Sequence, residues 1–271
     1  MEPDISKLLE LESQELHDDA AVEAALIGVP APRSADVLLA KFCSLGVTPD
    51  DLVIDLGCGH GQYAQQITSV TGCKVVALDQ SPARAVETRA ATGNDAVVRV
   101  HVARAVAEAL PLGHQSVGFV WCRDMLNHVD LPRTLRECAA VLTPGGYMLV
   151  YQTFATKLLE PLEAERIYTA FAIAARNMNP AYFEACALDA GFTTIERDAI
   201  GSEWRESWEV EDGSRNTSEN LLRAARLLRG SEVVSKRLGE KTYAFAIADQ
   251  LWGVYQMIGK LCPTVYVLRR S

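Results

Sequence analysis

Several patterns that mark whole classes of protein are missing from this sequence of 271 residues. Its seven cysteines are odd in number and widely spaced, and no two form a CxxC pair, so zinc ribbons and thioredoxin-like redox sites lack support. No run of about 18 uncharged apolar residues occurs, so we expect no transmembrane helix and no membrane partner. The acidic start, Met1–Leu16, lacks the basic-then-apolar pattern of a signal peptide. Reduced thiols in a cytoplasmic protein are the simplest expectation.

Positive charge is also scarce. The chain has 26 lysines and arginines against 35 aspartates and glutamates, which gives a formal net charge of −9. A surface for nucleic acid needs a basic face, so a nucleic-acid partner is disfavoured and a small-molecule substrate is favoured. Hydrophobic residues make up 49% of the chain, which predicts a substantial core. The sequence leaves the oligomeric state open, a homo-oligomer included.

Short apolar segments alternate with amphipathic ones along the chain. We predict strands at Leu52–Leu56, Lys74–Leu78, Ala96–Ala103, Val117–Cys122, Tyr147–Tyr151, Thr193–Asp198 and Val265–Leu268. We predict helices at Asp4–Ile27, Ala35–Leu45 (capped by Ser34), Gln62–Val70, Pro82–Ala91, Leu131–Leu142, Pro161–Asn177, Ala181–Ala190 and over most of Leu221–Gly259, with a turn at Pro144–Gly146 and a loop at Glu209–Ser218. This alternation predicts a parallel, doubly wound α/β sheet whose ligands bind at the carboxyl ends of the strands.

A glycine loop stands between the first predicted strand and the next helix. The segment Asp55-Leu-Gly57-Cys-Gly59-His-Gly61 spaces its glycines as GxGxG, unlike the GxGxxG of dinucleotide sites, and no Walker-type Lys-Ser/Thr follows. Glycines permit positive φ angles and a close approach of the backbone to a ligand. The carboxylate of Asp55 is a poor neighbour for a pyrophosphate and suits a ligand with an ammonium group. The alternative is a tight turn without a ligand.

The second predicted strand also ends in an acid, Asp79. A carboxylate at this position can accept hydrogen bonds from both hydroxyls of a ribose. Ser81-Pro82 indicates that a helix starts nearby, so Asp79 can serve as a helix cap as well. The two roles are compatible.

Five segments, in this order, resemble the motifs of class I S-adenosylmethionine (SAM)-dependent methyltransferases. They are Val53–Gly61, Val76–Ser81, Ala107–Leu112, Val120–Val129 and Leu142–Tyr147. The pattern is most similar to the small-molecule "methyltransferase type 11" group, which includes ubiquinone/menaquinone-type methyltransferases. The resemblance covers about residues 47–198 and the last strand.

The resemblance implies a Rossmann-like doubly wound sheet of about seven strands, mostly parallel with an antiparallel last strand. It implies a single methyltransferase domain over residues 1–271. Within it, residues 1–45 would form an N-terminal helical lid and residues 46–152 the SAM-binding core. Residues 153–271 would supply lid helices, the sixth strand, a helical insertion and the last strand.

The resemblance also assigns roles to individual residues. The cofactor SAM would be bound by Asp55, Gly57, Cys58, Gly59, Asp79, Gln80, Ala107, Glu108, Cys122 and Arg123. The first four would line the methionine and ribose side, Asp79 would take the ribose hydroxyls, and Gln80, Ala107 and Glu108 would lie at the adenine. Cys122 and Arg123 would face the transferring methyl.

Two positions depart from the family pattern. Val106 stands where an aspartate usually accepts from the adenine amino group, and Gly118 replaces an aspartate often found in the fourth strand. The first function that we expect is methyl transfer to an oxygen, nitrogen or carbon nucleophile of a small organic molecule, such as a secondary metabolite. The departures keep open a SAM-binding relative that catalyses a rearrangement or cyclisation, or a non-catalytic partner.

Catalysis of methyl transfer needs few chemical groups, because much of it rests on in-line positioning and exclusion of water. His128 is the candidate general base, since histidine exchanges protons near neutral pH; a purely structural role is an equal alternative. The other histidines show no metal-ligand spacing, so no metal is expected. Trp204, Trp208, Trp252 and Tyr255 are candidates for an aromatic pocket, or they belong to the core.

Overall fold

The computed structural model describes residues 25–27, 29, 32–85, 99–211 and 217–271. The chain divides into two compact units, Met1–Pro32 and Arg33–Ser271, and every element below belongs to the second. Most of the predicted helix Asp4–Ile27 lies outside the described residues. So do the end of the predicted helix Pro82–Ala91, of which residues 82–85 are helical, and the start of the predicted strand Ala96–Ala103.

A seven-stranded sheet forms the centre of the second unit. Its strands are β1 (Leu52–Leu56), β2 (Lys74–Asp79), β3 (Val100–Arg104), β4 (Val117–Arg123), β5 (Leu142–Ala155), β6 (Phe192–Ala199) and β7 (Leu261–Arg270), in the order β3-β2-β1-β4-β5-β7-β6. The first five strands in this order run parallel, whereas β7 pairs antiparallel with β5 and with β6. The predicted sheet, mostly parallel with an antiparallel last strand, is confirmed.

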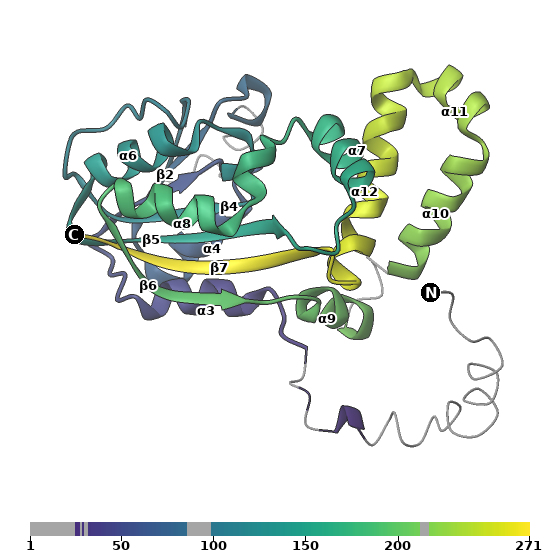
Figure 1. Ribbon diagram of the computed structural model, residues 1–271. Coiled ribbons are helices and arrows are strands. Elements are labelled where there is room, and N and C mark those ends of the chain that lie inside the picture. Colours follow the sequence, from purple (N-terminus) through teal and green to yellow (C-terminus); the bar gives the residue numbers. More distant parts are fainter. Residues whose placement is uncertain (1–24, 28, 30–31, 86–98, 212–216) are drawn as a thin grey trace. The chain divides into compact units, whose positions relative to one another are not determined.

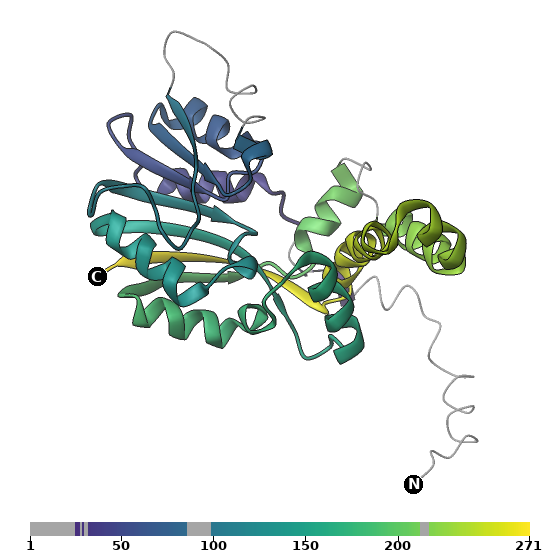
Figure 2. The same cartoon turned by 90° about the horizontal axis from the view of Figure 1, so that it is seen from above.

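Helices cover both faces of the sheet, which explains why its central strands are largely apolar (Figures 1 and 2). On one face, α6 (Leu131–Val141) and α8 (Pro180–Asp189) pack Leu135 and Phe183 against the strands. On the other face, α3 (Asp36–Ser44) and α4 (Gln62–Thr71) contribute Phe42 and Ile67. Phe42 meets Trp121 of β4 edge to face, with ring centroids 5.3 Å apart, and both are fully buried.

A third core lies among helices beyond the carboxyl end of β5, at the right of Figure 1. Its helices are α7 (Pro161–Phe171), the 3₁₀ turn η2 (Ala175–Met178), α10 (Thr217–Arg229) and α12 (Glu240–Met257), and α11 (Ser231–Leu238) lies against α12 without a buried residue of its own. Ile167, Ala248 and Leu261 are buried in this cluster. A further helix, α9 (Glu203–Glu211), follows β6. None of the helices formed by the described residues is long and apolar enough to cross a membrane.

Four local predictions were wrong. The turn predicted at Pro144–Gly146 lies inside β5, where a register shift opposite Val117 and Phe119 absorbs the extra residues and Gly145 takes a φ of 78°. The helix predicted over Pro161–Asn177 ends at Phe171, because Ala172 adopts the left-handed conformation with a φ of 54°. Residues 209–211, 217 and 218, predicted as loop, are helical. Finally, α3 begins without any side-chain cap from Ser34.

Gly118 lies near the amino end of β4, far along the strand from the carboxyl ends at which ligands bind. A Cβ atom at this position would stand 3.2 Å from Oδ1 of Asp51, in the turn that precedes β1. The carboxylate of Asp51 accepts hydrogen bonds from the backbone N–H and the hydroxyl of Thr48. Packing against Asp51 at the amino ends of the strands therefore explains why the family's aspartate is absent at this position.

We expect Gly118→Asp to destabilise the fold by about 1–3 kcal/mol, because a second carboxylate would be forced against Asp51. Gly118→Ala introduces the same Cβ without the charge and is the matched control. The free energy of unfolding in urea measures both. Equal losses for the two variants would show that crowding, and not the charge of Asp51, excludes an acid here.

Candidate functional site

The glycine loop is tied to the end of the neighbouring strand. The backbone N–H groups of Gly57 and Cys58 both donate to the carbonyl oxygen of Leu78, at 2.8 and 3.0 Å. Gly57, Gly59 and Gly61 have φ angles of 75°, 55° and 76°, which residues with a side chain rarely adopt. The loop therefore turns sharply from β1 into α4 while it stays against the carboxyl end of β2.

Gly57 also permits a close contact across the site. A Cβ atom there would lie 2.5 Å from Cγ and 2.8 Å from Cβ of Met125, which follows β4. The two segments can approach this closely only because Gly57 has no side chain.

Asp79 is fixed in place at the end of β2. Its Oδ2 accepts a hydrogen bond from the N–H of Gly59 at 3.1 Å, and its Oδ1 accepts one from the N–H of Ser81 at 2.8 Å. A carboxylate has about four lone-pair positions, so two bonds leave capacity for a ligand. The carboxylate thus holds the glycine loop and offers acceptors to the cavity beside it.

Asp55, at the end of β1, is a buried acid with only 3% of its surface exposed. Burial raises its pKa to about 7; a hydrogen bond with the backbone of Ala64 opposes the rise, and the negative charge of Asp79 adds to it. Its Oδ2 has no hydrogen-bond partner among the described residues. A buried carboxylate oxygen without a donor is costly, and a ligand carrying N–H groups would satisfy it.

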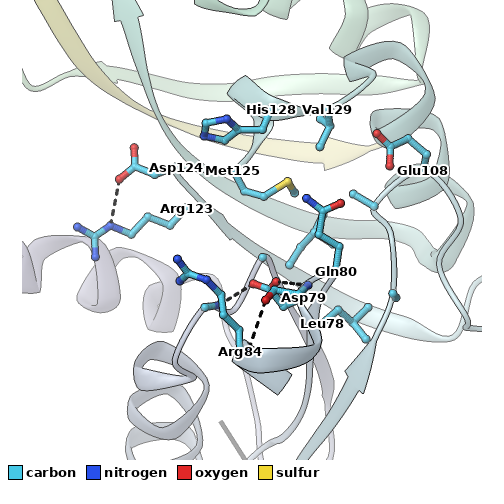
Figure 3. Close-up of a pocket in the computed structure, with 16 residues that line it drawn as sticks. Leu78, Asp79, Gln80, Arg84, Glu108, Arg123, Asp124, Met125, His128 and Val129 are labelled. Atoms are coloured by element: carbon cyan, nitrogen blue, oxygen red, sulfur yellow. Dashed lines mark hydrogen bonds and ion pairs between the residues drawn. The ribbon is translucent and has the colours of Figure 1, made fainter. Parts of the chain in front are cut away.

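The loop cavity, a hollow of about 440 Å³, opens where these strands end (Figure 3). The predicted site residues that line it are Gly57, Gly59, Asp79, Gln80, Ala107, Glu108, Arg123 and His128. They come from four segments of the chain, at or just after the carboxyl ends of β1, β2, β3 and β4. These strands are neighbours in the sheet, so their ends lie together. His128 and Asp124 lie across the cavity from Asp79 and Arg84 in Figure 3.

The side cavity, of about 230 Å³, adjoins the loop cavity and shares Gly57, Gly59 and Arg123 with it. Asp55 and Cys58, which do not line the loop cavity, line this second one. The structure thus brings nine of the ten predicted cofactor-binding residues to one of these two cavities. The exception is Cys122, whose side chain is fully buried in the core that lies under α6 and α8.

Arg123 is held between two aromatic rings at the end of β4. Its guanidinium carbon lies 4.8 Å from the ring centroid of Tyr63 and 5.3 Å from that of Tyr151. It also donates a hydrogen bond to the hydroxyl of Tyr63. These contacts fix the cation beside both cavities.

Asp124 is the residue that sequence reasoning missed. It lines the loop cavity, the side cavity and a third, aromatic cavity formed by Asp124, Asn127, His128, Phe171, Ile173, Phe245, Asp249 and Trp252. Its backbone takes a left-handed φ of 51°, unusual for a residue other than glycine, and unusual backbone angles cluster at functional sites. No motif predicts such an angle; the acid's place directly after the fourth strand was the signal.

The side chain of Asp124 is 46% exposed. Partial desolvation of its carboxylate by the surrounding chain raises its pKa, while the positive charges of Arg123 and Arg205, the influence of His128 and a hydrogen bond from Thr153 oppose the rise. Nε of Arg123 lies 3.8 Å from its Oδ2. An acid with its proton affinity raised in this way can hold a proton or pair with a cation at the junction of the cavities.

His128 ends the 3₁₀ turn η1 (Leu126–His128) and lines both the loop cavity and the aromatic cavity. Its Nδ1 lies 3.4 Å from the carbonyl oxygen of Ala172, the residue that follows α7. The other ring nitrogen, Nε2, is left for a different partner. This position allows the predicted role as a base and the structural alternative alike. Val106 is 46% exposed, and its neighbours Ala105 and Ala107 line the loop cavity.

Residues 54–150 match the family of methyltransferase domains named Methyltransf_11. The chain is 34% identical over 100 residues to sarcosine/dimethylglycine N-methyltransferase of Halorhodospira halochloris. That match spans 36% of this chain and 36% of the relative, well short of the relative's full length.

Two solved structures show the same fold at low identity. One is geranyl diphosphate C-methyltransferase from Streptomyces coelicolor in complex with Mg²⁺, geranyl diphosphate and S-adenosyl-L-homocysteine, with a TM-score of 0.65 and 16% identity over 87% of this chain and 77% of that chain. The other is the [4+2]-cyclase SpnF, with a TM-score of 0.67 and 18% identity over 87% of this chain and 81% of that chain. One architecture therefore carries different activities, and the activity has to be argued from the site.

We expect Gly57→Ala to destabilise the protein more than Gly46→Ala. Both glycines have positive φ angles, 75° and 90°, and an alanine in this conformation costs about 1–2 kcal/mol. Only Gly57 faces an obstacle, Met125, whereas nothing lies within 4 Å of a Cβ at Gly46. Unfolding in urea should give a loss at least about 1 kcal/mol larger for Gly57→Ala; equal losses would mean that Met125 moves aside freely.

The raised pKa of Asp55 makes stability depend on pH. Because the folded protein retains the proton up to about pH 7 and the unfolded chain releases it near 4, stability falls as pH rises through that window. The slope should reach up to about 1.4 kcal/mol per pH unit. Asp55→Asn cannot titrate, so its unfolding free energy should fall less steeply between these values. Parallel curves for the two proteins would contradict this.

Proposed function

We propose that the chain belongs, through residues 54–150, to the class I SAM-dependent methyltransferase family and that it transfers a methyl group from SAM to a small organic acceptor. The nucleophile is an oxygen, nitrogen or carbon atom of that acceptor. The observation that carries this proposal is the pair of acids, Asp55 and Asp79, at the ends of adjacent strands on the two sides of the glycine loop.

The residues at the two cavities fit SAM. The unpartnered Oδ2 of Asp55 suits the ammonium of the methionine end, and the spare lone pairs of Asp79 suit the ribose hydroxyls. Gly57 and Gly59 line both cavities and have no side chain, so a ligand can approach the backbone of the loop. Gln80, Ala107 and Glu108 line the same cavity and support adenine at its far end, where Glu108 stands in for the aspartate that Val106 replaces.

SAM, when bound, supplies a methyl group on a positively charged sulfur, and the sulfur leaves as a neutral thioether. The chain has to hold the acceptor in line with that methyl group and keep water away. Arg123, fixed between Tyr63 and Tyr151, limits access from one side. His128 lies where the loop cavity meets the aromatic cavity, and there it can take a proton from an acceptor that has to lose one.

A cyclase or rearrangement enzyme on the same fold is the second candidate function. The similarity to a [4+2]-cyclase supports it at the level of fold. Such an enzyme would bind SAM or its demethylated product without consuming it. Formation of S-adenosylhomocysteine from SAM, with a supplied acceptor, separates the two.

The same proposal extends to partners, location and domain organisation. The net charge of −9 argues against nucleic acid as a substrate. All seven cysteines lack disulfide bonds, which supports a reducing, cytoplasmic environment. The helices α7 and α10–α12, beyond the carboxyl end of β5, support the prediction that residues 153–271 supply lid helices within one methyltransferase domain. A homo-oligomer stays a prediction.

Two variants and two ligands test the proposed SAM site. Asp79→Asn should weaken both SAM and adenosine about tenfold or more, since charge-assisted bonds to the ribose are lost. Asp55→Asn should weaken SAM by a similar factor and leave adenosine unchanged, because adenosine has no methionine ammonium. Isothermal titration calorimetry measures the Kd of SAM for each variant, and the Kd of adenosine follows from its competition with SAM. Wild-type protein that binds no SAM would refute the proposed function.

A further inference from the structure

The aromatic cavity has about 330 Å³ and opens next to the junction at Asp124 and His128. Three rings line it. Phe171, the last residue of α7, lies with its ring centroid 5.2 Å from that of Phe245 and 5.5 Å from that of Trp252, and its plane is turned by 86° and 83° from theirs. Rings set nearly at right angles form a corner, with walls that face different directions.

One helix supplies two of the three rings and one acid of this cavity. Phe245, Asp249 and Trp252 are separated by four and three residues on α12, which places them on one face of the helix. An acid is thereby presented between two aromatic side chains. The Oδ2 of Asp249 accepts a hydrogen bond from the neutral amide of Gln250 at 3.0 Å.

The charge around the cavity is negative. Its lining, as far as the structure describes it, includes the carboxylates of Asp124 and Asp249 and neither lysine nor arginine. The charge of Asp124 is partly balanced by the positive charges of Arg123, which lies 3.8 Å away, and of Arg205. Asp249 is therefore the main source of negative charge next to the rings.

Asn127 adds a buried acceptor to the same lining. Its side chain is 3% exposed, and its Nδ2 donates to the carbonyl oxygen of Thr153 at 3.3 Å. Since that carbonyl can only accept, the orientation of the amide is fixed. Its Oδ1 has no hydrogen-bond partner in the described part of the chain. A donor from a ligand would satisfy it.

We propose that the aromatic cavity binds an acceptor with a small amine group and that the nitrogen of this amine is the atom methylated. Aromatic faces and carboxylates together attract a cation, whereas a neutral hydrocarbon or quinone would desolvate two acids without compensation. An anionic acceptor would be repelled. This inference rests on the proposed function, because the methyl group reaches the amine from the loop cavity.

The reaction balances with the groups present. The protonated amine gives its proton to the imidazole of His128, which passes it to water, and the nitrogen lone pair is set free. That lone pair forms the new N–C bond as the C–S bond breaks, and the electron pair of the broken bond stays on sulfur. Overall the amine gains a methyl group and one proton is released.

A binding experiment tests the cavity without any turnover. Choline and 3,3-dimethylbutan-1-ol have the same shape and differ only in the charged nitrogen. Calorimetry in the presence of S-adenosylhomocysteine should show that wild-type protein binds choline at least about tenfold more tightly than the neutral analogue. Asp249→Asn and Trp252→Leu should reduce this preference. Equal binding of the two probes by wild-type protein would overturn the inference.

A kinetic experiment tests the acceptor class. Benzylamine and N-methylbenzylamine, compared with benzyl alcohol, should support formation of S-adenosylhomocysteine from the amines only. Asp249→Asn should raise the KM for the amine about tenfold and leave the Kd of SAM unchanged, and Asp249→Glu should restore part of the loss. Glu240→Gln, which removes a charge at the start of the same helix, is the matched control and should behave as wild type.

The outcomes separate the two proposals. If the protein binds no SAM, the proposed function fails, while the comparison of choline with its neutral analogue still judges the cavity. If SAM binds and turnover occurs with alcohols or carbon acids but not with amines, the inference fails and methyl transfer stands. A KM for the amine that is unchanged in Asp249→Asn would also overturn it.

Discussion

The pairing of β1 with β2 is the constraint on which the rest of the site depends. Their register sets Leu56 opposite Leu78, and the carbonyl oxygen of Leu78 then receives the N–H groups of Gly57 and Cys58. Asp79, one residue further, accepts the N–H of Gly59. Strand pairing, loop shape and the positions of two acids are thereby one hydrogen-bonded unit. A shift of one residue in register would turn each side chain to the opposite face of the sheet and separate the acids from the loop.

The same unit explains why Asp55 can remain so unfavourably placed. A buried acid whose pKa is raised to about 7 stores free energy that folding elsewhere has to offset. The two large cores on either side of the sheet provide that surplus, with Phe42 and Trp121 on one face and Leu135 and Phe183 on the other. Strain of this kind persists at functional sites because the surrounding packing determines the geometry. The acid thus has an oxygen, Oδ2, for which the described residues supply no hydrogen-bond partner.

Much of this arrangement could be predicted from the sequence, for physical reasons that differ between its parts. The buried parallel strand Leu52–Leu56 is short and, apart from Asp55, apolar, so its bounds were predicted to the residue. The glycine loop was predictable because positive φ angles demand glycine. The left-handed angles at Asp124 and Ala172 were not, since neither residue type signals them, and with them the end of α7 and the junction of the cavities were missed. Cys122 was misplaced because a strand's alternation sends neighbouring side chains to opposite faces, and Arg123, not Cys122, faces the cavities.

The proposed acceptor side of the site is built differently from the proposed cofactor side. The loop cavity is built from strand ends, whose positions are set by the sheet, whereas the three rings of the aromatic cavity come from α7 and α12, which share a separate core around Ile167 and Ala248. Substitutions on the exposed face of α12 can therefore change the cavity lining without disturbing the sheet or the glycine loop. Asp124 and His128 line both the loop cavity and the aromatic cavity, so a substitution at either position affects the two cavities together. Because the acceptor side depends on contacts between helices distant in sequence, local patterns could not predict it, while the cofactor side is encoded in one continuous stretch from β1 to the end of β4.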